Sequence, residues 1–140
     1  MRLRVACAAV PALIGLVVAG AAAPLFWRGG SLNLAEAAAL RDAGEAVRLI
    51  ASGADPNATY PLRPGILAAE SLTPLEAAVG ARRAEMVELL MLHGAKVDLA
   101  GWRRLNCFAQ KTGATDVVTT LDHFAPATAR ASCEGISTPF

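Results

Sequence analysis

Histidines and neighbouring carboxylates are the side chains of this sequence that most often take part in catalysis or metal binding. His93 and His123 are its two histidines, and no cysteine or carboxylate recurs beside them at the spacing of a zinc site. Glu85 and Glu88 lie three residues apart, on what we expect to be the solvated face of a helix. The sequence contains no G-x-S-x-G motif and no phosphate-binding loop. These patterns predict no enzymatic activity, no metal or other cofactor and no small-molecule substrate.

The cysteines indicate structural rather than catalytic chemistry. Cys7 lies within an apolar N-terminal run and is interpreted as a small hydrophobic residue. Cys107 and Cys133 belong to a region that we expect outside the cytoplasm, where disulfides persist. The sequence leaves two alternatives open for this pair. One is a bridge that contributes roughly 3 to 4 kcal/mol in the chain-entropy model, and the other is two unpaired thiols, one of them buried.

Composition and charge favour one small helical domain that binds no nucleic acid. The chain has 140 residues, enough for one domain of common size with an extra terminal segment, and aromatic residues make up only 5%. From Arg28 onward it carries 11 basic and 12 acidic residues, a balance that offers no excess of positive charge for phosphates. The local basic pairs, Arg82-Arg83 and Arg103-Arg104, are interpreted as solvated helix ends or loops.

The N-terminal segment predicts a membrane anchor over residues 1–28. Residues 5–27 carry no formal charge, and as a helix they would extend about 34 Å, enough to span a bilayer. Arg2 and Arg4 precede this run and Arg28 alone follows it, so the positive-inside rule places the N-terminus in the cytoplasm. The rest of the chain is then extracytoplasmic, which means periplasmic in a bacterium.

A cleaved signal peptide is the alternative for the same residues. A basic start, an apolar stretch and the small residues 19–23 fit that pattern, and the product would be secreted or periplasmic. Cleavage after Ala23 would leave Pro24 first, which peptidases disfavour. Trp27 and Arg28 resemble an interfacial anchor, with the aromatic ring among headgroups and the cation in water, so we favour the retained anchor.

Paired helical patterns alternate with glycine-containing loops from residue 32 onward, and residues 71–98 form the clearest unit. Thr73, Pro74 and Glu76 make the T-x-x-E capping box with proline at the first helical position, which predicts a helix start. A second helix follows, with an apolar stripe that includes Met86 and ends before Gly94. The unit is therefore a short helix, a tight turn, a longer helix and a loop.

This unit resembles the ankyrin repeat. T-P-L-x-x-A at residues 73–78 and L-L-x-x-x-G-A at residues 89–95 carry the resemblance, residues 34–40 and 46–57 resemble an earlier copy, and residues 104–121 a later, degenerate one. The resemblance implies an all-α fold, an ankyrin-type helical repeat solenoid of about three units that stack to bury their apolar faces. We expect these units at residues 32–57, 71–98 and 101–124, with residues 125–140 as a C-terminal tail.

The sequence departs from the family pattern in several places. Gly53 and Gly94 are 41 residues apart, against a family period of about 33 residues. The excess falls in residues 58–70, which we interpret as an inserted loop because two prolines and a glycine interrupt any helix there. Glu76 stands where the family has histidine, and Arg103-Arg104 stand where the third copy would have T-P. These departures blur the repeat count but leave the fold prediction in place.

Loops between repeats, together with the concave face of the first helices, are where this family typically binds other proteins. In the inserted loop the candidate protein-binding residues are Tyr60, Leu62, Arg63, Ile66 and Leu67, a mixture of aromatic, aliphatic and cationic side chains typical of interaction hot spots. Their alternative is to fold back over the stack as a satellite cluster. In the next loop the candidates are Trp102 and Arg103, and partial burial is the alternative for Trp102.

These expectations combine into a non-catalytic protein–protein interaction module. The ankyrin-type domain would be held at the membrane through residues 5–27 and would bind a partner protein on the extracytoplasmic side. The alternative function is a structural or inhibitory, immunity-type protein that stabilises a membrane assembly or blocks an exported enzyme.

Overall fold

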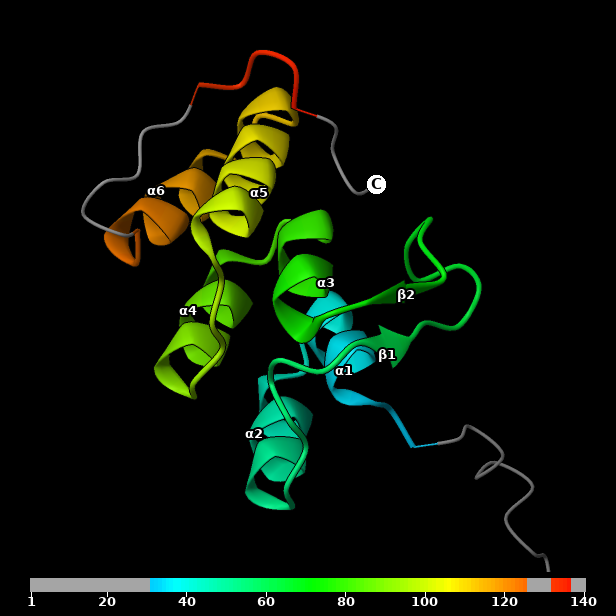
Figure 1. Cartoon of the computed structure of the whole chain (residues 1–140). Helices are drawn as coiled ribbons and strands as arrows, with labels where there is room; N and C mark the ends of the chain where they lie inside the picture. The colour runs from blue at the N-terminus through cyan, green and yellow to red at the C-terminus, as the bar shows by residue number, and fades with distance from the viewer. Residues whose placement is uncertain (1–30, 126–131, 137–140) are drawn as a thin grey trace, which may run out of the picture. The chain divides into compact units, whose positions relative to one another are not determined.

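The structure is a computed structural model that describes residues 31–125 and 132–136, and within them the chain is mostly helical (Figure 1). The predicted membrane segment, residues 1–28, lies outside the described residues. None of the helices in the described part of the chain combines the length and the apolar character needed to cross a bilayer. The elements are α1 (Leu34–Leu40), α2 (Ala43–Ala51), β1 (Tyr60–Pro61), β2 (Ser71–Leu72), α3 (Pro74–Gly80), α4 (Ala84–Leu92), α5 (Leu99–Lys111) and α6 (Thr115–His123).

The helices form three consecutive pairs whose connecting turns share one geometry. Arg41, Arg82 and Gly113 occupy the turns of α1–α2, α3–α4 and α5–α6, and all three have a positive φ, of 65°, 56° and 69°. In each turn the amide of that residue donates to the carbonyl three residues earlier, and the next amide donates to the carbonyl five residues before it. These bonds satisfy helix carbonyls that would otherwise lack donors.

Side-chain caps fix where the first helices of the pairs begin. Thr73 and Glu76 form the predicted capping box at α3, and Asn33 and Glu36 form a second one at α1. At α5 the Asp98 side chain accepts a hydrogen bond from the amide of Gly101 at 2.7 Å. Each cap supplies an acceptor for amides that the helix leaves unpaired.

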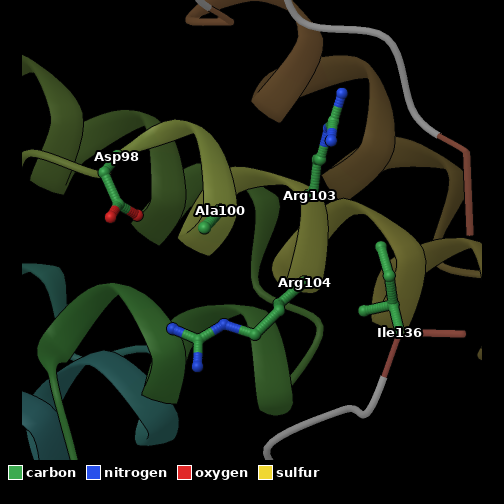
Figure 2. Close-up of a pocket in the computed structure, with 5 residues that line it drawn as sticks. All are labelled: Asp98, Ala100, Arg103, Arg104 and Ile136. Atoms are coloured by element: carbon green, nitrogen blue, oxygen red, sulfur yellow. The ribbon is translucent and has the colours of Figure 1, made fainter.

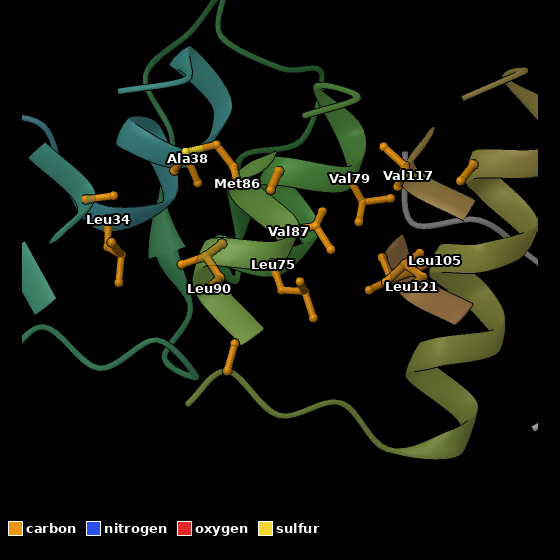
Figure 3. Packing of buried hydrophobic residues seen from close by; sticks show 14 of the residues in the cluster. Leu34, Ala38, Leu75, Val79, Met86, Val87, Leu90, Leu105, Val117 and Leu121 are labelled. Carbon is orange, nitrogen blue, oxygen red and sulfur yellow. The ribbon is translucent and has the colours of Figure 1, made fainter. Parts of the chain in front are cut away.

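The core of the described residues runs between successive pairs, because α1 packs on α3, α3 on α5 and α4 on α6 (Figure 3). Alanines are fully buried on the facing sides of α1 and α3, which lets the two helices approach closely. Larger side chains fill the remaining space between the pairs. The principal ones are Leu34, Leu75, Val79, Met86, Val87, Leu90, Leu105, Val117 and Leu121.

A side-chain bridge links the loop after α2 to the loop after α4. The Asn57 side chain donates to the carbonyl of Gly94 at 3.1 Å and accepts from the amide of Lys96 at 2.7 Å. Asn57 thus satisfies backbone groups 37 and 39 residues further along the chain. This side-chain amide therefore ties the two loops together.

The structure also corrects the expected elements. Residues 58–70, expected to be loop only, contain strand β1, which pairs antiparallel with β2 so that Tyr60 lies opposite Leu72. The third helix pair begins at Leu99 rather than at residue 101, because Asp98 caps α5. His93 is the exposed C-cap residue of α4, and the buried residues of this helix are Met86, Val87 and Leu90.

Candidate interaction surface

Residues 58–72, here called the hairpin segment, fold back onto α1 and α3 more than expected. Leu62 is buried, and it joins a small cluster with Leu72 and alanines of α1 and α3. Ile66 and Leu67 are partly buried against the same cluster. For Leu62 the structure therefore supports the alternative of a satellite cluster over that of an exposed binding residue.

An ion pair attaches the hairpin segment to α1. The carboxylate of Glu36 is nearly inaccessible, and it accepts from the Arg63 guanidinium at 2.8 and 3.2 Å and from the Arg63 amide at 3.1 Å. The Asn33 side chain adds a hydrogen bond to the carbonyl of Pro61 at 2.6 Å. Arg63 thus serves an intramolecular contact, although about half of its side chain remains exposed.

The environment of Glu36 favours its charged form. Burial alone raises the pKa of this carboxyl, but the hydrogen bonds from the Arg63 side chain and from the amides of Asn33 and Arg63 outweigh it, and the positive charge of Arg63 acts in the same direction. The pKa of Glu36 therefore lies below its ordinary value. A fully ionised carboxylate then holds the segment at neutral pH.

The residues expected in the next loop lie on helix α5 instead. Trp102 is buried, and its indole N–H donates to the carbonyl of Leu121 at 2.9 Å. The prediction of Trp102 as a surface anchor is therefore wrong, because the cap at Asp98 starts the helix early and turns the ring toward α6. A glycine is required at position 101, since a Cβ there would lie 2.9 Å from Asp98 Oδ1 and from Val97 Cγ2.

The exposed face of α5 forms a pocket with basic walls, here called the α5 pocket. Its volume is about 530 Å³, and its lining consists of Asp98, Ala100, Arg103, Arg104 and Ile136. In Figure 2, the Arg104 side chain extends below the turn that carries Asp98 and Ala100. The Arg103 side chain points away from this turn, on its upper side. Neither guanidinium makes an ion pair or hydrogen bond within residues 31–125 and 132–136.

A disulfide attaches the C-terminal tail beside this pocket. Cys107 of α5 is bonded to Cys133, with their Cα atoms 5.4 Å apart, which resolves the alternatives that the sequence left open. The Lys111 ammonium also donates to the carbonyl of Ile136 at 3.5 Å. These two contacts hold the described part of the tail along α5, where Ile136 becomes a wall of the α5 pocket.

A second pocket lies on the other side of Arg104, between the beginnings of α3 and α5. Its volume is about 260 Å³, and it shares Asp98 and Arg104 with the α5 pocket. The two carboxylates in this region are already engaged. Glu76 accepts from the amide and hydroxyl of Thr73 at 2.9 and 3.0 Å, and Asp98 accepts from the Gly101 amide. Lys96 and Arg104 are the basic groups that line this pocket beside the two carboxylates.

Sequence reasoning missed three residues of this surface. Arg104 counted only as part of a solvated pair, and neither Glu36 nor Ile136 stood out. A signal for Glu36 was present, since it follows Asn33 at capping-box spacing. Ile136 had no such signal, because its position depends on the disulfide.

The remaining polar groups do not assemble into a metal site among the residues that the structure describes. His93 is the C-cap residue of α4 and His123 is the last residue of α6, where they can interact with the last carbonyls. Comparisons of the chain with protein-family models, with curated proteins and with solved structures give no match.

Proposed function

We propose that this chain is a non-catalytic protein-binding module, an ankyrin-type array of three helix pairs displayed outside the membrane that its N-terminal segment enters. The observation that carries the proposal is the repetition of one turn geometry in the three helix pairs. Identical turns in consecutive pairs are what a repeat architecture requires, because each pair must present the same faces to its neighbours.

Two further features support the array. The loops after α2 and α4 also share a geometry, in which Gly53 and Gly94 have φ values of 99° and 92° and donate to the carbonyl three residues earlier. The first helices of the three pairs pack side by side in chain order, α1 on α3 and α3 on α5. The hairpin segment then corresponds to an enlarged loop of the family pattern, and α5 with α6 to its last unit.

The binding role follows from what the array leaves on its surface. Arg103 and Arg104 are exposed cations beside a pocket, on a helix whose residues Gly101, Trp102 and Leu105 are buried. Arginine is enriched at protein interfaces, where its fork and stem contribute both charge and contact area. Tyr60, Ile66 and Leu67 remain secondary candidates, because each keeps part of its side chain exposed.

The extracytoplasmic location is part of the same proposal. The Cys107–Cys133 bond supports it, since structural disulfides persist in oxidising compartments. Membrane attachment through residues 5–27 is tested by the N-terminal mass of the full chain recovered from membrane and soluble extracytoplasmic fractions. An intact N-terminus in the membrane fraction would support the anchor, whereas a soluble product that begins near Ala22 or Pro24 would establish cleavage.

Purification of the tagged full chain from its own cells, followed by reconstitution with the protein that accompanies it, tests the binding role. We expect one protein at fixed stoichiometry and saturable binding of the purified pair in calorimetry. The variant Arg103→Glu/Arg104→Glu should lose that binding while its helical circular dichroism stays unchanged. A chain that purifies without a stoichiometric protein, or that turns over substrates in a hydrolase screen, would contradict the proposal.

A further inference from the structure

We infer that the α5 pocket binds an acidic segment of the partner protein, with one carboxylate at Arg103, another at Arg104 and an apolar side chain against Ala100 and Ile136. This inference rests on the proposed binding role and specifies its chemistry. Its first support is the charge of the walls, where two guanidinium groups have no acceptor among the described residues.

The acidic residue of the pocket, Asp98, caps helix α5. Asp98 directs its Oδ1 to the amide of Gly101 at 2.7 Å, and no ion pair joins it to either arginine in the structure. Figure 2 shows its carboxylate on the opposite side of the Ala100 turn from the Arg103 side chain. A carboxylate from outside would therefore meet unpaired donors, which form short and strong charge-assisted hydrogen bonds.

The dimensions and the apolar part of the pocket favour a peptide over a lone anion. A volume of about 530 Å³ lies within the range of pockets that hold a ligand much larger than one carboxylate. Ala100 and the Ile136 side chain supply apolar surface next to the charges. Arg104 also lines the neighbouring pocket of about 260 Å³, so an extended segment can continue from one pocket into the other.

The complete α5 pocket depends on the disulfide between Cys107 and Cys133, because this bond positions its Ile136 wall. Ile136 lies three residues after Cys133, and the bond to Cys107 holds this short segment along α5. A pocket whose wall is already fixed binds its ligand without the entropy cost of ordering that wall. Reduction should therefore weaken the binding of acidic segments without removing the two arginines.

Selection from a phage library of random twelve-residue peptides on the immobilised full chain tests the inference. We expect aspartate and glutamate to be enriched among selected peptides, and synthetic copies of them to bind about tenfold or more weakly to Arg103→Glu/Arg104→Glu. The charge-matched control Arg48→Glu/Arg82→Glu changes two exposed arginines outside the pocket lining, and should bind within about twofold of the original chain. Because Arg48 also loses its ion pair with Glu45, helical circular dichroism of the control must match that of the original chain. Arg103→Lys/Arg104→Lys should retain part of the binding, because lysine keeps the charge and loses the fork.

Each other result would overturn the inference. Peptides without acidic enrichment, or no selected peptides, would show that the pocket does not take this chemistry, although a stoichiometric partner would still support the binding role. Acidic peptides that bind both double-glutamate variants equally would show general attraction. Stronger binding to phosphatidylserine vesicles than to the peptides, lost in Arg103→Glu/Arg104→Glu, would assign the arginines to a lipid surface.

Discussion

Arginine has opposite roles in the hairpin segment and in the α5 pocket. Arg63 meets the buried carboxylate of Glu36, and the pair holds residues of an enlarged loop against α1. Arg103 and Arg104 lie on the exposed face of α5, with no carboxylate among the described residues within ion-pair distance. A basic side chain in a loop or at a helix start therefore indicates a protein-binding site only when its own chain does not already supply a carboxylate acceptor for it.

The same contrast separates apolar residues of the two regions. Leu62 and Trp102 both belong to segments expected at the surface, yet both are buried. Their neighbours Arg63 and Arg103 remain accessible. A binding surface in this chain is therefore defined residue by residue, and the predictions that follow test which side chains hold the framework and which are free.

The largest effect on the free energy of unfolding is expected at Trp102, a buried residue next to the exposed Arg103. Trp102→Ala should lower the free energy of unfolding by about 4 kcal/mol, because it leaves a cavity between α5 and α6 and removes the donor to the Leu121 carbonyl. Arg103→Ala is the matched control and should change it by less than about 0.5 kcal/mol. Chemical denaturation of both variants measures the difference. Similar losses at the two positions would mean that the burial assigned to Trp102 is wrong.

The disulfide is expected to have the next largest effect. Cys133→Ser opens a loop with a sequence separation of 26 residues, which in the chain-entropy model corresponds to about 3.5 kcal/mol. The α5 pocket should lose its Ile136 wall, whereas the contact of Glu36 with Arg63 should stay intact. Thermal unfolding with and without a reductant provides the measurement, and the serine variant should not respond to the reductant. A reductant response equal to that of the original chain would contradict the assigned bond.

Glu36 should give a smaller, pH-dependent effect. Glu36→Gln leaves Arg63 without its carboxylate and replaces the charged acceptor of the Asn33 amide by a neutral one, which we expect to cost about 2 kcal/mol at neutral pH. The folded pKa of Glu36 is lowered, so its contribution is complete above the ordinary value of about 4.3 and is lost as the pH falls through the lower folded value. The stability difference between the variant and the original chain should therefore shrink in acid.

A double-mutant cycle with Arg63→Met isolates the pair from the cap. Coupling of about 1 kcal/mol is expected, since Arg63 is half exposed and solvent screens part of the attraction. A coupling near zero would place the stabilising effect of Glu36 in the capping box alone. Arg63 would then join Arg103 and Arg104 as a residue available to a partner.

The sequence predicted local features well and long-range ones poorly. The Thr73 capping box, the glycine at the end of α4 and the helix at residues 34–40 depend on neighbours within a few positions, and the structure contains all three. The partner of Arg63 lies 27 residues away, and the wall at Ile136 depends on a disulfide. The spacing of residues in the sequence reveals neither contact. For that reason Arg63 and Arg103 were equivalent candidates for protein binding in the sequence.

The shared turn geometry provides a comparison at the backbone level. Arg82 adopts a φ of 56° at the position where the last pair has Gly113, with a φ of 69°. Because a left-handed conformation strains residues with a Cβ, Arg82→Gly should stabilise the domain by about 1 kcal/mol, and Gly113→Ala should destabilise it by a similar amount. The space around Gly113 is open, so no steric clash would complicate the second change. Effects of equal sign in the two variants would argue against equivalent turns.

The smallest effect on stability is expected for the two residues with the largest expected effect on binding. Arg103→Ala/Arg104→Ala should change the free energy of unfolding by less than about 0.5 kcal/mol, because neither side chain has a partner among the described residues. The measurement is denaturation of this variant beside Glu36→Gln under the same conditions. A loss as large as that of Glu36→Gln would mean that these arginines, like Arg63, already serve the fold, and the distinction between the two regions would fail.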